Sequence, residues 1–373
     1  MIGFLVVYFL IYTGIHTAVW FDLRVILPDS PTFRIFTLAF FLIMIAAPVA
    51  SWFLEDLGYH RLSRASAWAG FLWMGLVLML SLTLLAAWLV HIGFRLISLA
   101  PGWTFIPDPR FMALAAAVLA GLLTVYGMIE AQSIRIERVR LETTKLPPGL
   151  DHLKIAQISD LHVGPMTRVS RIERIADLIE REKPDLLVST GDLVDGHALP
   201  YEDLKRLFGR IKPRLGKFAV PGNHEVYVGL DWSRRCLEHC GFKLLRNEAL
   251  TLAGTINLAG VDDPAARSVV NETRMLESAG NHFYTILLKH QPRVRQDSPG
   301  RFDLQLSGHT HRGQIFPFNF VTGAIYPMQD GLYRLANGSA LYTSRGTGSW
   351  GPPLRILAPP EITIIEIVSI AGK

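Results

Sequence analysis

The chain has 373 residues, of which 50% are hydrophobic and only 18% are charged, with a formal net charge of +5. This length favours two domains over one, and the mild charge, carried by scattered basic residues, argues against a nucleic-acid partner. The hydrophobic excess lies almost entirely before residue 130. The composition therefore predicts a membrane domain over residues 1–130, followed by an ordinary globular domain.

Four stretches in the N-terminal part are apolar enough to cross a bilayer: residues 2–20, 35–53, 67–90 and 111–129. None of them contains Asp, Glu, Lys or Arg. A span needs roughly 20 apolar residues in a helix, and backbone groups in lipid must be paired within the segment, which favours helices. A cleaved signal peptide is the alternative for the first stretch, although it lacks a basic n-region. A soluble all-helical domain is the alternative for the whole block.

The distribution of basic residues predicts the orientation in the membrane. With four spans, the loop at 54–66 and the segment after residue 129 lie on one side, which carries six basic residues against four on the other. Positive residues favour the cytoplasmic side. We therefore expect a multi-pass protein of the cell membrane with its C-terminal domain in the cytoplasm.

Residues 131–152 are expected to form a linker, because a charged helical extension there ends in Pro147, Pro148 and Gly149. From residue 153 to residue 373, short β-rich runs alternate with helical patterns, which predicts an α/β layered domain. Helices are expected to begin after capping residues Ser170 and Asp231. Strands are expected at residues 153–159, 186–189, 218–220, 256–261, 285–288, 304–306, 340–343 and 362–368.

Five of these strands are followed by side chains that bind metals. Ligand sites in open α/β sheets lie at the carboxyl ends of strands, so these side chains are expected at one sheet edge. In an extended segment, residues two apart point the same way, so both members of each D-x-H or H-x-H pair can reach one cluster. The residues concerned are Asp160, His162, Asp192, Asn223, His224, His290, His309 and His311.

The residue types indicate a metal centre without thiolate ligands. Carboxylate, amide oxygen and imidazole suit Mn²⁺, Fe or Zn²⁺. Seven such groups are too many for one ion but suit two that share a carboxylate, and two cations about 3.5–4 Å apart can hold a hydroxide and clamp a phosphoryl group. Each motif alone has an ordinary interpretation as a turn, a polar loop or a buried histidine; their joint occurrence in order favours the metal centre.

These motifs resemble the calcineurin-like metallophosphoesterase superfamily, whose pattern is D-x-H, G-D, G-N-H-E, H and G-H-x-H. All five blocks occur in order over residues 153–315. The flanking residues 308–314 and 344–348, with Arg355, are similar to the bacterial membrane-associated branch. The resemblance implies a four-layer sandwich of mixed sheets flanked by helices, and two divalent metal ions, for which manganese is favoured over iron or zinc.

The resemblance also implies a role for each motif residue. His224 is expected to be the catalytic histidine, which contacts the phosphate and protonates the leaving oxygen. The implied metal ligands are Asp160, His162 and His311 for one metal and Asn223, His290 and His309 for the second, with Asp192 bridging.

Two arginines are further candidates for substrate binding. Arg312 stands where a glycine is usual in that branch, so its charge would meet a phosphate oxygen; a solvated surface arginine is the alternative. Arg345 lies in the similar C-terminal segment. Relatives that act on phosphoproteins carry a phosphate-binding R-G pair after G-D-x-x-D, whereas Gly196 and His197 follow Asp195 here. This departure argues against protein phosphatase activity.

The leading hypothesis is metal-dependent hydrolysis of a phosphoester or pyrophosphate bond in a lipid-linked or amphipathic substrate at the membrane surface. The bilayer and a phosphate-containing substrate are then the expected partners. One alternative is a general phosphodiesterase for soluble substrates whose helices serve only localisation, and another is a membrane sensor with a phosphoesterase output. Phe316, Phe318, Phe320 and Trp350 are expected mainly as core residues, with insertion into the membrane interface as the alternative.

Overall fold

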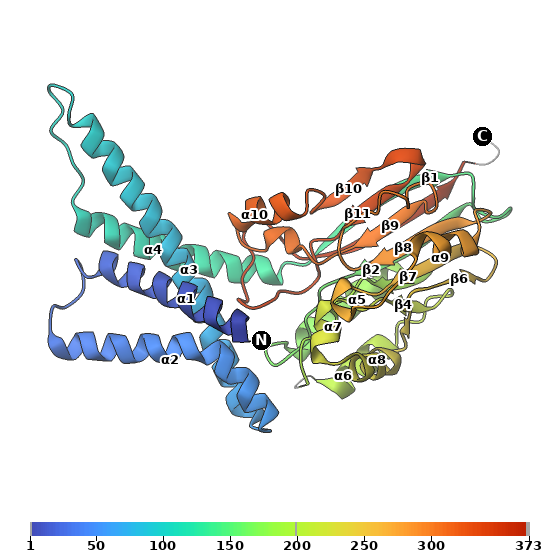
Figure 1. Ribbon diagram of the computed structural model, residues 1–373, viewed down its shortest axis with the longest axis horizontal. Coiled ribbons are helices and arrows are strands. Elements are labelled where there is room, and N and C mark those ends of the chain that lie inside the picture. Colours follow the sequence, from blue (N-terminus) through green and yellow to red (C-terminus); the bar gives the residue numbers. More distant parts are fainter. Residues whose placement is uncertain (1, 198–199, 371–373) are drawn as a thin grey trace. The chain divides into compact units, whose positions relative to one another are not determined.

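The computed structural model describes residues 2–197 and 200–370. The chain divides into two compact units (Figure 1). The helical unit comprises Met1–Ile129 and the short segment Gly351–Leu354. The α/β unit comprises Glu130–Trp350 and Arg355–Lys373.

The helical unit contains the four predicted helices, each longer than the apolar stretch that predicted it. They are α1 (Ile2–Leu23), α2 (Pro31–Asp56), α3 (His60–Ile97) and α4 (Pro109–Gln132). All four are long and apolar enough to cross a membrane. Helix α2 begins where Ser30 accepts a hydrogen bond from the Phe33 amide (3.2 Å) and a proline occupies the first turn.

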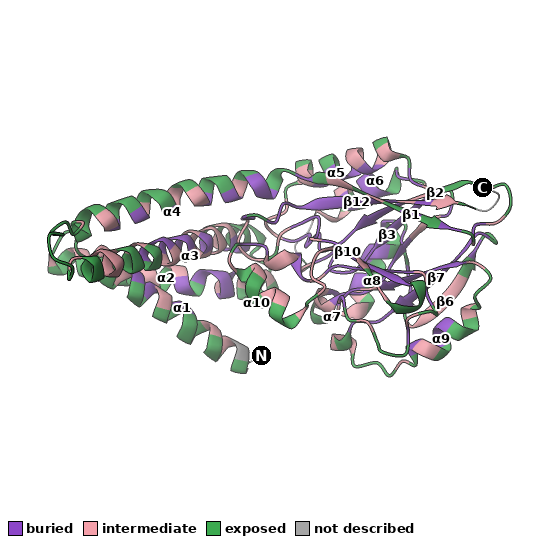
Figure 2. Ribbon diagram, turned by 90° about the horizontal axis from the view of Figure 1, so that it is seen from above, coloured by how far each residue is buried: buried purple, intermediate pink, exposed green. Residues whose placement is uncertain are grey.

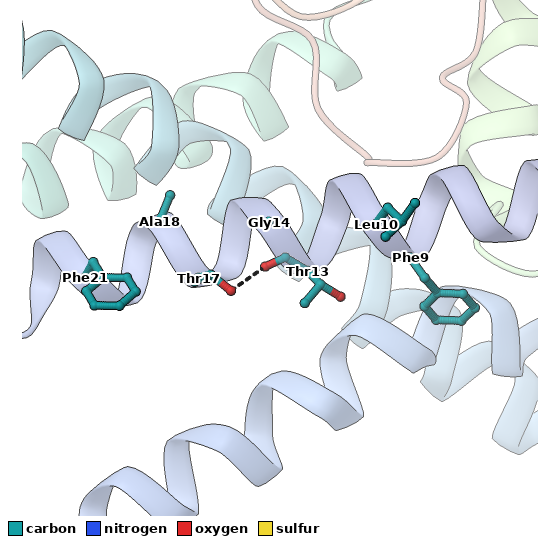
Figure 3. Close-up of a pocket in the computed structure, with 7 residues that line it drawn as sticks. All are labelled: Phe9, Leu10, Thr13, Gly14, Thr17, Ala18 and Phe21. Atoms are coloured by element: carbon teal, nitrogen blue, oxygen red, sulfur yellow. Dashed lines mark hydrogen bonds between the residues drawn. The ribbon is translucent and has the colours of Figure 1, made fainter.

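Some polar side chains inside the helical unit are paired by hydrogen bonds, which lowers the cost of placing them in an apolar environment. The Trp73 indole N–H donates to His16 Nε2 (2.8 Å), and His16 Nδ1 donates to the Tyr12 carbonyl (2.7 Å). A shallow pocket lies along α1 between Phe9 and Phe21 (Figure 3). The Thr17 hydroxyl there donates to the Thr13 carbonyl (2.9 Å), so the Thr17 side chain is satisfied within the helix.

The α/β unit is built on two six-stranded mixed sheets, which confirms the predicted fold class. In each sheet the central strands are parallel and at least one neighbouring pair is antiparallel. The first sheet has the order β1 (Arg135–Thr143), β12 (Glu361–Ser369), β2 (His152–Ile158), β3 (Leu186–Ser189), β4 (Lys217–Ala219), β5 (Lys243–Leu244). The second has the order β10 (Gly331–Arg334), β11 (Ala340–Thr343), β9 (Leu304–Ser307), β8 (Tyr284–Lys289), β7 (Ile256–Val261), β6 (Glu248–Leu252).

Helices cover the outer faces of both sheets, so the unit has four layers. Apolar residues of α5 (Val169–Glu182), α6 (Tyr201–Gly209) and α8 (Leu230–His239) pack on the first sheet. Helix α9 (Glu272–Ala279) packs on the second. The largest core lies between the sheets, where Ile155 and Val188 of one meet Leu258 and Leu288 of the other. Buried residues accordingly concentrate in the sheets (Figure 2).

The helical extension predicted within the linker is wrong, because residues 135–143 form strand β1, which pairs in parallel with β12. The strand lies at the sheet edge, and its charged side chains are largely exposed. Charge on an edge strand discourages pairing with other chains. The same mixture of charges also suits an exposed helix, which is why the sequence predicts a helical extension.

Both predicted helix caps are also displaced. Helix α5 begins at Val169, so Ser170 lies inside it, and α8 begins at Leu230, so Asp231 lies in its first turn. A carboxylate in the first turn still interacts favourably with the helix dipole. Seven further helices and strands were not predicted from the sequence. They are α6, α9, β5, β6, β10, α7 (Asn223–Val228) and α10 (Phe318–Ile325).

Candidate metal centre

The loops that follow β2, β3, β4, β8 and β9 meet at one place in the α/β unit. Their carboxylates and imidazoles form three groups in which the ligand atoms lie within 4.8 Å of one another. The Asn223 amide oxygen joins them, 3.1 Å from His290 Nε2. All seven predicted ligands are therefore brought together, and their individual roles stay predictions. The groups are Asp160, His162 and His311; His162, Asp192 and His224; and Asp192, His290 and His309.

Five of these residues have a left-handed backbone. Since non-glycine residues adopt positive φ rarely, and Asp and His more readily than most, such clustering is typical of a functional site. Both members of each D-x-H and H-x-H pair do reach the cluster, as predicted. The predicted extended backbone is wrong, because the residues of each pair have positive φ angles. The φ angles are 52° at Asp160, 49° at His162, 53° at Asp192, 71° at His309 and 47° at His311.

The packing around the carboxylates fits resident cations. A side chain at Gly222 would place its Cβ 2.1 Å from the nearer Asp192 oxygen, and one at Gly308 would lie 2.3 Å from an Asp160 oxygen. Both glycines are therefore needed for the backbone to approach the carboxylates. The two carboxylates are almost wholly buried, and buried charge needs an opposite charge or a metal. Divalent cations held by the surrounding oxygens and imidazoles satisfy that need.

Hydrogen bonds prepare His290 to bind a metal through Nε2. Its Nδ1 lies 2.8 Å from the Thr190 carbonyl, which can only accept, so Nδ1 carries the proton. Nε2 is left facing the cluster, 3.2 Å from Asp192 Oδ2. Metal-binding histidines normally donate their other N–H to such an acceptor. Burial lowers the pKa of His290, but the Asp192 carboxylate outweighs burial and raises it. A metal cation would neutralise the same carboxylate.

A chain of hydrogen bonds likewise fixes His309. The Gln291 amide N–H donates to Asp263 (2.9 Å), so its oxygen faces Tyr326 and accepts the Tyr326 hydroxyl proton (3.1 Å). The hydroxyl oxygen must then accept from His309 Nε2 (3.1 Å). His309 Nδ1 is left for the metal, 3.1 Å from His290 Nε2. Asp263, Gln291 and Tyr326 were not among the residues predicted for the site.

His311 is held differently, by a buried arginine. The Arg355 guanidinium donates to His311 Nδ1 (2.9 Å), and its other N–H groups bind backbone carbonyls such as those of Arg345 and Ala358. His311 Nε2 therefore faces the cluster, 3.5 Å from Asp160 Oδ1. Burial and the charge of Arg355 hold the pKa of His311 well below its usual value, so the imidazole is uncharged at neutral pH.

Glu225, the last residue of the G-N-H-E motif, joins two of the loops. Its carboxylate accepts backbone N–H groups from Gly222 (2.8 Å), Asp192 (2.8 Å) and Leu193 (2.7 Å). The side chain is buried. Glu225 therefore fixes the position of Asp192 without being one of the clustered ligands.

His224 lies beside the predicted ligands and is held by the Asp195 carboxylate. Its Nδ1 is 2.5 Å from Asp195 Oδ1, and its ring is 4.7 Å from the His162 ring between centroids. Burial lowers the pKa of His224, but the Asp195 hydrogen bond and charge outweigh it and raise the pKa to about 9. The imidazole is therefore protonated at neutral pH, as a general acid requires.

The two candidate arginines have different surroundings. Arg345 is held by Glu137 (2.5 Å) and Glu361 (2.7 Å), and its side chain is only 12% exposed. The structure thus gives Arg345 a structural role, and its prediction as a substrate ligand gains no support. Arg312 directly follows the predicted ligand His311, its side chain is 42% exposed, and its Nε lies 3.4 Å from Asp330 Oδ2. Substrate binding by Arg312 stays a prediction.

Comparisons with known proteins agree with this geometry. The family model described as calcineurin-like phosphoesterase matches residues 153–313. An uncharacterized metallophosphoesterase of Aquifex aeolicus is 40% identical over 255 residues, which are 67% of this chain and 97% of that protein. A Danio rerio protein named transmembrane protein with metallophosphoesterase domain is 32% identical over 68% of this chain. The match spans only 62% of the length of that protein.

Solved structures resemble the chain more distantly. A 5'-nucleotidase precursor from Thermus thermophilus has a TM-score of 0.34 and 12% identity, over 58% of this chain and 54% of that one. The similarity to the Aquifex relative, over nearly the whole length of that protein, establishes the family. The chain therefore belongs to the calcineurin-like phosphoesterases, a family of hydrolases that use divalent metals.

Proposed function

We propose that the protein hydrolyses a phosphoester or pyrophosphate bond at the membrane surface, in a lipid-linked or amphipathic substrate. The observation that carries the hydrolytic part is the convergence of the seven ligand side chains beside His224, which Asp195 keeps protonated. Two divalent metal ions, with manganese favoured, would supply a nucleophilic hydroxide and neutralise charge on the phosphoryl group.

The ligand geometry supports a division into two sites. Asp192 Oδ2 lies 3.2 Å from His290 Nε2 and 3.8 Å from His162 Nε2. Its carboxylate thus reaches both groups of imidazoles and suits a bridging position. Asp160 and His311 complete the first site with His162, and Asn223 and His309 complete the second with His290.

His224 is the proposed general acid. Asp195 binds Nδ1, which orients the ring and leaves Nε2 to donate a proton to the leaving oxygen. A group in this role typically contributes about 10²–10⁴ in rate. The Trp350 and Tyr227 rings lie 5.7 and 5.6 Å from the His224 ring between centroids. These aromatic rings limit the access of water to the imidazole.

The four apolar helices support a membrane-bound substrate. Confining enzyme and substrate to one surface raises their effective concentration without any new contact, whereas a soluble substrate gains nothing from it. A general phosphodiesterase that is merely localised by its helices, or a sensor with a phosphoesterase output, would have the same metal centre. A comparison of hydrolysis rates on soluble and on membrane-bound substrates distinguishes these functions.

A fragment of residues 130–373 is therefore expected to hydrolyse a small soluble diester as fast as the full chain, and to fall well behind on a lipid-linked phosphoester in vesicles. The fragment must include β1, which a start at residue 146 would remove. Residues 130–350 and 355–373 form a compact unit with its own core, which supports independent folding of the fragment. Equal rates on vesicles would favour the localised phosphodiesterase.

The catalytic domain is proposed to lie in the cytoplasm, because six basic residues flank its side of the spans against four opposite. A reporter pair fused after Lys373 tests this orientation. Green fluorescent protein is expected to fluoresce there, and alkaline phosphatase is expected to stay inactive. The reverse result would place the catalytic domain outside the cytoplasm.

A further inference from the structure

Helix α10 lies on the surface of the α/β unit with none of its eight residues buried. The side chains of Phe320, Val321 and Ile325 are 68%, 56% and 58% exposed. Phe316, Phe318 and Trp350 are 43%, 43% and 49% exposed, so the expectation that these aromatics are core residues is wrong. Exposed apolar side chains that gather in one region mark a site that binds another protein or a membrane.

These exposed apolar residues are here called the apolar rim: Phe316, Phe318, Phe320, Val321, Ile325 and Trp350. The Phe316 and Phe320 rings lie 5.8 Å apart between centroids. The Gln314 side chain binds both the N–H and the carbonyl of Trp350 (2.9 Å each), which ties Trp350 to the segment leading into α10.

The apolar rim adjoins the metal centre at two points. The Trp350 ring lies 5.7 Å from that of His224, between centroids. At the other end, Tyr326 follows the last residue of α10 and binds the ligand His309. A phosphate at the metal centre would therefore have the apolar rim directly beside it.

We infer that the apolar rim inserts into the membrane–water interface and holds the metal centre at the bilayer surface; this rests on the membrane-bound substrate proposed above. Residues 316–326 contain no charged side chain, which suits insertion, and aromatic side chains favour the interface. Two basic residues flank the rim and suit anionic headgroups. Arg312 precedes it, and the Arg293 guanidinium lies 5.0 Å from the Tyr326 ring centroid.

Chain connectivity favours a bilayer over another protein as the occupant. The residue after Trp350 begins Gly351–Leu354, which groups with the apolar helices, and α4 leads directly into the α/β unit at Glu130. The domain is thus joined at two separate points to a unit whose helices could cross a membrane. Helix α10 is linked through Gln314 to Trp350, which directly precedes one of these junctions. A short interfacial helix needs no further partner to cover its apolar side.

Site-specific quenching in the full chain tests the insertion. Cys236 and Cys240 are both buried, so a cysteine introduced by Phe320→Cys can be labelled selectively with an environment-sensitive fluorophore. Val269→Cys is the matched control, because Val269 is also apolar and is 102% exposed, far from the rim in sequence. Both variants are reconstituted in vesicles of phosphatidylcholine and phosphatidylglycerol, with and without spin-labelled lipid.

The label at position 320 is expected to lose at least half of its fluorescence to lipids spin-labelled near the headgroup, while the label at position 269 is unaffected. Equal behaviour of the two labels would overturn the inference. So would a label at 320 that is shielded from both lipid and aqueous quenchers, because a protein surface would then cover the rim. Quenching is measured without substrate turnover, so the two proposals can fail separately. If the label at position 320 is quenched by lipid but the protein hydrolyses no lipid-linked ester, the proposed function is contradicted and the membrane insertion is not.

Discussion

Asp192→Asn is expected to abolish nearly all hydrolysis and to lower the bound metal from two ions per chain toward one. Asp192 is the carboxylate that reaches both groups of imidazoles, 3.2 Å from His290 and 3.8 Å from His162. The amide keeps the shape of the side chain and can still accept the His224 backbone N–H (2.8 Å). The variant therefore loses the negative charge between two cations while the fold is retained.

Metal analysis of the purified chain and turnover of a phosphate ester, measured on the same sample, check this prediction. Asp231→Asn is the matched control, because Asp231 is exposed in the first turn of α8. The control should keep both metal content and turnover. An Asp192→Asn enzyme with normal turnover would contradict the bridging assignment.

His224→Ala is expected to keep its metal ions yet lose about 10²–10⁴ in turnover. The ring is engaged through Nδ1 by Asp195 at 2.5 Å, and the seven predicted ligands remain after its removal. Its proton is needed only where the leaving oxygen is a poor leaving group. The loss should therefore be large for an alkyl phosphoester and much smaller for a nitrophenyl ester.

The comparison of leaving groups separates acid catalysis from ligation. His224 also lies within ligand distance of His162 and Asp192, so a direct role in metal binding is the rival assignment. If metal content falls in His224→Ala, and both esters slow equally, the ligand role is correct instead. His239→Ala, at an exposed position in α8, is the control and should change neither quantity.

The positions of the metal-binding residues could be predicted because each motif directly follows a strand. Runs such as residues 153–159 are apolar and β-rich, and parallel strands deliver their following residues to one edge. The turn geometry could not be predicted in the same way. The left-handed backbone at Asp160 and His309 depends on close approach to neighbouring loops, which sequence spacing does not encode.

The residues that orient the ligands were beyond prediction for a related reason. Asp263, Gln291 and Tyr326 come from three separate segments and meet only in the folded chain. Arg355 was noticed as part of a resemblance, but its hydrogen bond to His311 crosses 44 residues of sequence. Such contacts carry no local signal. The four apolar helices, in contrast, could be predicted directly, because a helix able to cross a membrane needs roughly 20 consecutive apolar residues.

The most direct test of the two-metal centre is turnover measured against metal content as Mn²⁺ is added back to metal-free full-length protein. Cooperation between two ions predicts almost no hydrolysis at one ion per chain and a steep rise as the second site fills. A parallel titration of Asp192→Asn should remain inactive throughout. Full turnover at one ion per chain, or in protein freed of metal, would contradict the account.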